Sequence, residues 1–315
     1  MTMRYATTLT ALLLSAGLSL SAMPAAQAAD DTIVFGAPAW PGISVKTEIA
    51  SQLLSALGYH PKAQEIGLQV IYQGLDSGDV DLFLGAWLPA QQPMLAPLEE
   101  KGSVRHLATN VTGAQMTLAV PEYVYDSGIT SFADLDAHRD EFGGEIYGFG
   151  AGSAASEILN KAIDADTWGL GDWTLVDTST VGMLSAVKSH IDNHEPIVWV
   201  GWKPHWMNLE FPMHYLSDSK NLFGKGNGAS DVRTLMASKY ADAHPNLVTF
   251  FDQFSFSSAE QSWMIQQYGQ VGESQQAVAK AWITAHPEEV QAMLKGVETT
   301  TGEPAWPAVK AAFSL

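Results

Sequence analysis

Three tryptophans give the clearest chemical signal in the sequence. Trp40 lies in Ala-Pro-Ala-Trp-Pro-Gly, Trp87 in Leu-Gly-Ala-Trp-Leu-Pro and Trp202 in Val-Gly-Trp-Lys-Pro. Each stands at the C-terminal end of an expected strand, beside a turn marked by Pro or Gly. Ligands of open α/β sheets bind in the crevice outside these strand ends, so we expect the three indoles to share one ligand site. For any single tryptophan, packing of a loop onto its own lobe is the plainer alternative.

Indole faces attract cations, and each face supplies about 0.5 to 2 kcal/mol when the site is desolvated. A methylated ammonium suits such a box because it has no N–H group for a carboxylate or carbonyl to recognise. A sugar site also stacks rings on Trp, but it needs many polar side chains nearby, and these segments are poor in them. The three tryptophans therefore predict a small quaternary ammonium ligand.

A glycine-rich segment at 148–156, Gly-Phe-Gly-Ala-Gly-Ser-Ala-Ala-Ser, leads from an expected strand into an expected helix. Helix N-termini present unpaired N–H groups, so this turn can hold an anion. Ser153 is the expected N-cap, with the amides of Ala154 and Ala155 facing a ligand carboxylate. One alternative is a turn without a ligand. Another is a dinucleotide fingerprint, but Ser153 replaces its third glycine.

The N-terminus has the composition of a secretory signal peptide. Arg4 is the only charged residue before an apolar run at 9–20, and small residues follow at 25–29. We expect a signal peptide at 1–29, cleaved near Ala28 or Ala29, with a signal anchor as the alternative. No later run is long enough to span a membrane, so we expect a soluble mature protein.

Composition narrows the setting and the partners. The chain has no cysteine, which excludes disulfides and a lipid anchor on an N-terminal Cys, and an exported chain without an anchor fits a periplasm. The net charge of −18 excludes nucleic acid as the main partner. This acidity either keeps the protein soluble or concentrates a cationic ligand. We expect a monomer without a cofactor or a metal.

Short apolar runs alternate with helical patterns, which indicates an α/β fold. Strands are expected at 31–35, 69–72, 80–84, 115–120, 145–149, 173–177 and 196–200, and helices at 45–57, 156–163 and 182–191, with a mainly helical pattern after 231. About 285 residues remain after cleavage, which is more than one ordinary core and indicates two lobes.

The lobes are expected to be joined by short crossings near Gly113 and Pro212, because the sequence contains no long linker. Lobe one then comprises 30–113 and 213–315, and lobe two comprises 114–212. This division places Trp40 and Trp87 on one lobe, and Trp202 with the glycine-rich turn on the other.

Four stretches resemble the glycine betaine, proline betaine and choline substrate-binding proteins of ABC importers, and the likeness covers nearly the whole mature chain. The stretches are 77–89, 146–148 with the turn after it, 182–184 and 201–207. The resemblance implies a two-lobed, type II-like periplasmic binding protein fold with its ligand in the interlobe cleft. It also implies a membrane permease as the partner and no enzymatic activity.

In that family three tryptophans form a prism around the ammonium head, and the matching positions are Trp40, Trp87 and Trp202. Members that bind glycine betaine hold its carboxylate with two amides, which fall on Ala154 and Ala155, and with a histidine after a Trp-x-Pro motif. No such histidine follows Trp87-Leu-Pro, so Gln91 or Gln92 has to donate instead. His205 and Trp206 flank Trp202, where they either border the site or serve a structural role.

Choline binders of the family differ from this chain. They carry Asp where it has Gly42, Tyr where it has Met116, and Asn-Asp where it has Ser153 and Ala154. The resemblance therefore favours glycine betaine, followed by carnitine, proline betaine or another methylated zwitterion, with choline behind them. Trimethylamine N-oxide or an amino acid are further alternatives.

His190 and His194 have the i, i+4 spacing that can hold a metal on one helix face. No third ligand is evident, so a solvated helix surface is the favoured interpretation. A periplasmic hydrolase or metalloenzyme that uses these histidines or His205 is the rival hypothesis from another class. The HExxH, paired-cysteine and G-x-S-x-G motifs are all absent.

Overall fold

The structure is a computed structural model that describes residues 1–2 and 31–315. The predicted signal peptide at 1–29 therefore lies almost wholly outside the described residues. One nine-stranded mixed sheet runs through the described part in the order β2-β1-β3-β9-β4-β7-β5-β6, with β8 beside β4. The strands are β1 (Thr32–Ala37), β2 (His60–Glu65), β3 (Leu82–Leu88), β4 (Val104–Pro121), β5 (Glu145–Phe149), β6 (Thr174–Thr178), β7 (Trp199–Lys203), β8 (Met213–Tyr215) and β9 (Ala229–Ala237).

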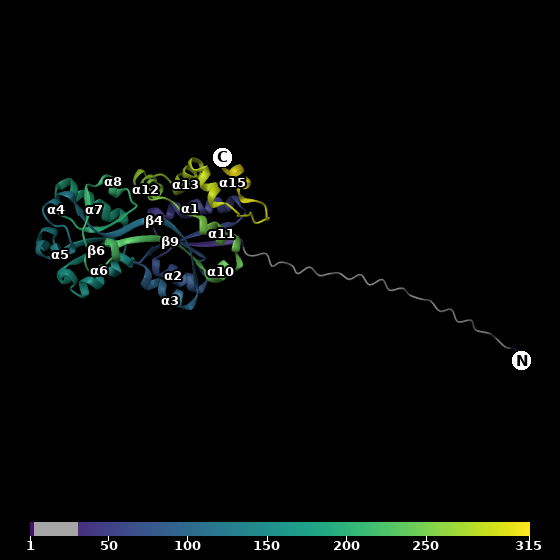
Figure 1. The fold of residues 1–315 in the computed structure, drawn as a ribbon, viewed down its shortest axis with the longest axis horizontal. Helices are drawn as coiled ribbons and strands as arrows, with labels where there is room; N and C mark the ends of the chain where they lie inside the picture. The colour runs from purple at the N-terminus through teal and green to yellow at the C-terminus, as the bar shows by residue number, and fades with distance from the viewer. Residues whose placement is uncertain (3–30) are drawn as a thin grey trace.

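Helices cover both faces of this sheet (Figure 1). In the first half of the chain they are α1 (Pro41–Ala56), α2 (Leu68–Ser77), α3 (Gln92–Lys101), α4 (Glu122–Asp126), α5 (Phe132–Leu135), η1 (Asp136–Phe142) and α6 (Ala154–Asp164). In the second half they are η2 (Thr167–Asp172), α7 (Thr180–Asn193), α8 (Met207–Glu210), α9 (Lys225–Gly228), α10 (Ser238–Ala243), α11 (Pro245–Gln253), α12 (Ser258–Gln266), η3 (Gln267–Val271), α13 (Gln275–Ala285), α14 (Pro287–Met293) and α15 (Ala305–Phe313).

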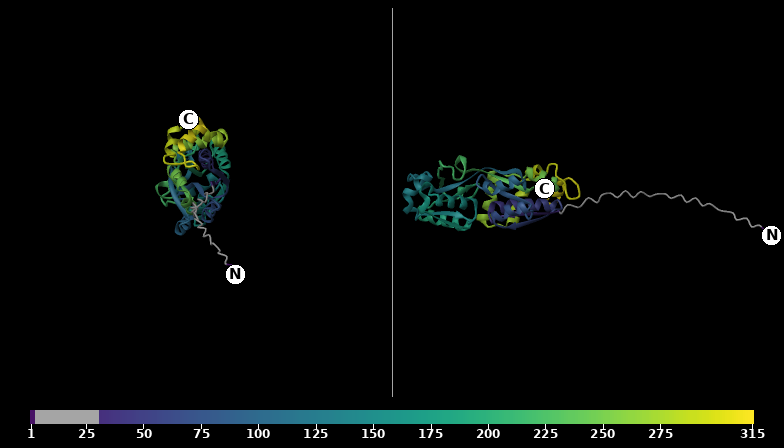
Figure 2. Two further views of the ribbon diagram at one scale, coloured as in Figure 1. Left: turned by 90° about the vertical axis from the view of Figure 1, so that its right-hand side faces the viewer. Right: turned by 90° about the horizontal axis from the view of Figure 1, so that it is seen from below.

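The buried apolar side chains form two large clusters, one in each lobe. The first draws on residues between 33 and 107 and between 235 and 309, and the second on Ala90 and residues between 116 and 223. Figures 1 and 2 show the lobes side by side along the long axis of the molecule. The predicted α/β, two-lobed fold class is confirmed.

Strands β4 and β9 carry the chain between the lobes. They pair antiparallel from Val104 opposite Ala237 to Gln115 opposite Ala229, and the register shifts three times between His106 and Ala114. Such bulges bend and twist a strand pair. A third small cluster of Val111, Ala114 and Val232 packs at this crossing, apart from both cores.

The second core extends past Pro212, where the sequence predicted the return crossing, because Leu216 and Phe223 pack in it. The strand that leads back to lobe one is β9. The lobe limits 30–113 with 213–315, and 114–212, stay a prediction.

The strand predicted at 69–72 was wrong, because these residues belong to helix α2. The apolar run Val-Ile-Tyr has strand propensity, but the buried residues Leu68, Ile71, Tyr72 and Leu75 follow helical spacing. The strand next to β1 is β2, which the sequence pattern missed. It lies at the sheet edge and is mostly exposed and polar, so it lacks the apolar alternation of a half-buried strand.

The difference in burial between two leucines predicts a difference in how much each contributes to the stability of the fold. Leu53 in α1 is fully buried, whereas Leu209 in α8 is 72% exposed. We expect Leu53→Ala to lower the free energy of unfolding by about 2–5 kcal/mol, because the lost apolar contacts leave a cavity. The matched control Leu209→Ala should stay within about 0.5 kcal/mol of the wild type. Urea denaturation followed by tryptophan fluorescence measures both, and equal losses would contradict the packing described.

Candidate ligand-binding site

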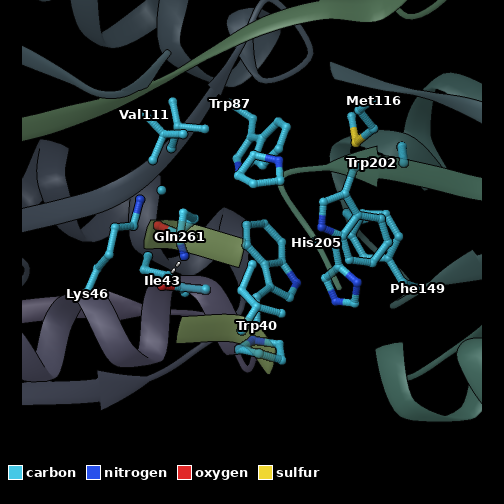
Figure 3. A pocket seen from close by; sticks show the side chains of 18 of the residues that line it. Trp40, Ile43, Lys46, Trp87, Val111, Met116, Phe149, Trp202, His205 and Gln261 are labelled. Atoms are coloured by element: carbon cyan, nitrogen blue, oxygen red, sulfur yellow. Dashed lines mark hydrogen bonds between the residues drawn. The ribbon is translucent and has the colours of Figure 1, made fainter. Parts of the chain in front are cut away.

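A cavity lies where the two lobes meet, and Figure 3 shows it from close by. Lobe one supplies the start of α1, the end of β3 and part of α12. Lobe two supplies the end of β5, the start of α6 and the segment from β7 to His205. The crossing strands β4 and β9 complete the wall with Val111, Met116 and Val232. The cavity therefore touches both lobes and the crossing between them.

The three tryptophans predicted to share a site all line this cavity. Trp40 is the N-cap residue of α1, Trp87 lies in β3 and Trp202 in β7. All three are half-buried, and in Figure 3 their rings gather around the centre of the cavity. The long-range arrangement comes from the sheet, which pairs Trp87 with Val232 of β9 and Trp202 with Met116 of β4.

Phe149 joins these rings, and the sequence interpretation missed it. Its ring centroid lies 4.5 Å from that of Trp202 and 6.2 Å from that of Trp40. It therefore contacts one tryptophan from each lobe. The available signal was its position, since it ends β5 immediately before the glycine-rich turn.

The turn after β5 is built as an N-terminal cap. The Ser153 hydroxyl accepts a hydrogen bond from the Ser156 amide at 3.2 Å and caps α6, as predicted. Ala154 and Ala155 follow as the first residues of the helix, and all three residues are buried and line the cavity. Helix geometry gives the amides of Ala154 and Ala155 no carbonyl partner within the helix. The turn can therefore offer N–H donors to an anion.

His205 adds a hydrogen-bond donor to the cavity. It is buried, and its Nδ1 accepts the backbone N–H of Met207 at 3.2 Å. An acceptor Nδ1 puts the ring proton on Nε2, which is buried and has no hydrogen-bond partner among residues 31–315. Burial lowers the pKa of His205 from 6.5 to about 3, so the ring stays neutral at physiological pH. The wall of the cavity thus contains a neutral imidazole whose Nε2–H has no hydrogen-bond partner among the described residues.

The two glutamines predicted to donate to the ligand differ in their position relative to the cavity. Gln91 is buried and lines the cavity, but its side chain is engaged: its Oε1 accepts from the Tyr72 hydroxyl at 2.8 Å and its Nε2 donates to the Gly85 carbonyl at 3.2 Å. Gln92 is outside the wall of the cavity, and its amide donates to Glu99 on the surface of α3. The structure therefore brings Gln91 to the cavity and Gln92 away from it.

Two polar residues in the wall were missed from the sequence. Lys46 of α1 is buried, and its Nζ donates to the Leu84 carbonyl at 3.1 Å and to Asn110 Oδ1 at 2.6 Å. Gln261 of α12 donates to the Gly42 carbonyl at 3.1 Å, while its Oε1 is buried without a partner in the described part of the chain. The signal for Lys46 was its helical spacing with Ile49 and Leu53, which places a lysine on a buried face.

His190 and His194 each contact other residues of the protein. His194 ends α7 in a left-handed conformation and stacks on Tyr123 with centroids 3.9 Å apart, while Nδ1 of His190 bonds to the Ala186 carbonyl. Residues 1–2 and 31–315 contain no group of three His, Cys, Asp or Glu side chains that could hold a metal ion.

Comparison with known families shows which family the chain belongs to. Residues 31–285 match the model of the substrate-binding domain of ABC-type glycine betaine transport systems. The chain belongs to this family. The resemblance stated from the sequence is therefore confirmed, and the family is one of transport proteins.

Solved structures support the same assignment. An ABC-transporter choline-binding protein in complex with choline is 33% identical, has a TM-score of 0.87, and is matched over 90% of this chain and 98% of its own. Lactococcal OpuAC in its closed conformation with glycine betaine is 24% identical with a TM-score of 0.74, over 83% and 98% of the two chains. The latter likeness concerns the fold alone.

Two curated relatives match by sequence. A glycine betaine/carnitine transport binding protein of Listeria monocytogenes is 28% identical over 177 residues, which is 55% of this chain and 58% of the relative. An uncharacterised protein of Chromohalobacter salexigens is 41% identical over 127 residues, 40% of this chain and 82% of the relative. Among the residues described, no helix of this family member has the length and hydropathy needed to cross a membrane.

The buried His205 predicts a pH dependence of stability. Its pKa is about 3 in the folded protein and 6.5 as its ordinary value, so between these pH values the unfolded chain binds the additional proton. The free energy of unfolding should therefore fall as pH drops below about 6.5, by up to about 1.4 kcal/mol per pH unit from this residue. Urea denaturation at about pH 7 and about pH 5 measures this loss, which integrates to roughly 2 kcal/mol.

The variant His205→Asn should lose this part of the pH dependence, because it has no titrating ring. His60→Asn is the matched control, since His60 is exposed on the edge strand β2. An H205N protein with the same difference between the two pH values as the wild type would contradict the assignment.

Proposed function

We propose that this protein is the periplasmic solute-binding component of an ABC importer and that it binds glycine betaine or a similar methylated zwitterion. The observation that carries the proposal is that a tryptophan box and neutral N–H donors line one cavity between two lobes. A zwitterion presents a cation and an anion a few bonds apart, so one cavity has to satisfy both.

The trimethylammonium head is assigned to Trp40, Trp87 and Trp202. This head carries charge but no N–H group, so it gains little from hydrogen-bond acceptors and much from aromatic faces. Each face contributes about 0.5 to 2 kcal/mol in a desolvated site. The ring of Phe149 packs beside both Trp40 and Trp202 and adds a further apolar surface to the box.

The carboxylate is assigned to the amides of Ala154 and Ala155 and to the Nε2–H of His205. A buried donor without a partner has a desolvation cost of about 1–3 kcal/mol, which a ligand acceptor removes. His205 thereby takes the place of the histidine that is missing after Trp87. Gln91 is the weaker candidate, because both ends of its amide already have partners, and Gln92 is no longer proposed as a direct contact.

Choline is the second candidate, because the 33% identical relative was solved with choline bound. The residues that line this cavity do not favour choline. Gly42 has no side chain, and a Cβ there would lie 2.7 Å from Nε2 of Gln261, which fills the space an Asp would need. Met116 offers a thioether where choline binders of the family carry a tyrosine hydroxyl.

The proposed mechanism is hinge closure without covalent chemistry. A ligand that contacts Trp87 in lobe one and Trp202 in lobe two stabilises the closed arrangement by its differential contacts. Gln69 of α2 already reaches lobe two in this structure, where its amide donates to the Gly152 carbonyl at 2.8 Å. We propose that the monomer in this closed form is what the membrane permease recognises, and that nucleic acid is not a partner.

Titration calorimetry on ligand-stripped protein tests the ligand class. We expect glycine betaine to bind most tightly, carnitine and choline more weakly, and histidine not at all, since none of the described residues that line the cavity has a carboxylate for a primary ammonium. The proposal fails if none of the methylated ammonium compounds binds tighter than about millimolar, which corresponds to about −4 kcal/mol.

Replacing one indole tests the aromatic box. Trp87→Ala should weaken glycine betaine binding by about 2- to 30-fold, because one face contributes about 0.5 to 2 kcal/mol. Trp306→Ala is the matched control, since Trp306 packs against the core of lobe one and is outside the cavity wall. Unchanged affinity in W87A, with W306A also unchanged, would remove Trp87 from the box.

A further inference from the structure

Lys46 places a buried basic group in the wall of a cavity assigned to a cation. Its side chain crosses from α1 to β3 and β4, where both hydrogen-bond acceptors, the Leu84 carbonyl and Asn110 Oδ1, are uncharged. No carboxylate of residues 31–315 forms an ion pair with it. An ammonium buried without a counter-ion is costly, and such groups are concentrated at functional sites.

The surroundings of Lys46 leave its charge unbalanced. The elements packed around it contribute Val111 of β4, Val232 of β9 and Gln261 of α12 to the cavity, all of them uncharged. Charged and titratable side chains of these strands and helices are engaged elsewhere: Glu260 with Trp282 and the Ser257 amide, Arg233 with Asp231, Arg105 with Asp242, and His106 with Glu99. His205 is the other titratable residue of the wall, and it is neutral.

The position of Lys46 relative to the box is visible in Figure 3. Lys46, Val111 and Gln261 lie on one side of Trp40 and Trp87, and Trp202 and His205 lie on the other. A ligand held with its ammonium head in the box and its tail toward His205 therefore has its positive end closer to Lys46. Ile43 and Val111, which line the cavity near Lys46, are apolar and offer little screening of the two like charges.

We propose that Lys46 is a specificity determinant that selects zwitterions over cations of the same shape by their net charge. The inference rests on the proposed function. A choline-like cation meets the full repulsion of the Lys46 ammonium. In a zwitterion the attraction of the carboxylate offsets part of this repulsion, so the net effect is smaller. Rejection of the wrong ligand by an uncompensated charge is a general route to specificity.

The charge of Lys46 can be changed without mutation. Burial lowers the pKa of Lys46 from 10.5 to about 7, so its ammonium is mostly protonated at about pH 6 and mostly neutral at about pH 9. The pKa of His205, at about 3, keeps that ring neutral over the whole range. Of these two titratable residues of the wall, Lys46 is therefore the one whose charge changes over this range.

The experiment measures dissociation constants of glycine betaine and choline at about pH 6 and about pH 9. In the wild type we expect the ratio of the choline constant to the glycine betaine constant to fall by about tenfold or more between the two pH values, since like charges placed together cost several kcal/mol. In Lys46→Met, which keeps a long apolar chain without the charge, the ratio should be low and equal at both. The exposed helix residue Lys280 provides the matched control Lys280→Met, which should behave as the wild type.

The outcomes separate the inference from the function it rests on. If both ligands bind and the ratio depends neither on pH nor on the Lys46→Met substitution, Lys46 does not discriminate and the inference is overturned while the proposed function stands. If the variant does not fold, the pH dependence in the wild type decides by itself. If the wild type binds neither ligand, the proposed function is overturned and the inference with it.

Discussion

The antiparallel pairing of β4 with β9 is the constraint on which the rest of the structure depends. These two strands are the centre of the sheet and join two separate hydrophobic cores into one molecule. Because both strands cross between the lobes, any change in their bulged register moves one lobe against the other. The cavity lies directly at this crossing, with Val111, Met116 and Val232 in its wall. The shape of the cavity therefore depends on the geometry of this crossing.

The cavity is built mostly from groups without formal charge. A methylated ammonium cannot donate hydrogen bonds, so aromatic faces serve it better than carboxylates, which would also attract primary amines and metal ions. Neutral N–H donors at the start of α6 and on His205 cost less to bury than cations do. Lys46 stands out against this background because, among the described residues that line the cavity, it is the one with a basic amino group, whose positive charge would oppose a cationic ligand head.

Local patterns in the sequence predicted several residues of the wall and missed others. Trp40, Trp87 and Trp202 were identifiable because strand ends and Pro or Gly turns can be recognised from neighbouring residues. Ser153 was identifiable as an N-cap for the same reason. Gln261 was not, since it lies on a helix whose approach to Gly42 spans 219 positions of sequence. The strand predicted at 69–72 was wrong because a short apolar run does not distinguish a strand from a helix.

The sequence by itself indicated the family, through the resemblance of four stretches, and it indicated the α/β class and the residues at several strand ends, because these are encoded in short motifs and local spacing. Only the tertiary structure decided which of those residues share a cavity. It turned Gln92 toward Glu99, and within residues 31–315 it left Nε2 of His205 without a hydrogen-bond partner and buried Lys46 without a counter-ion. The physical reason is that burial and hydrogen-bond partners are set by contacts between distant segments, which no local pattern encodes.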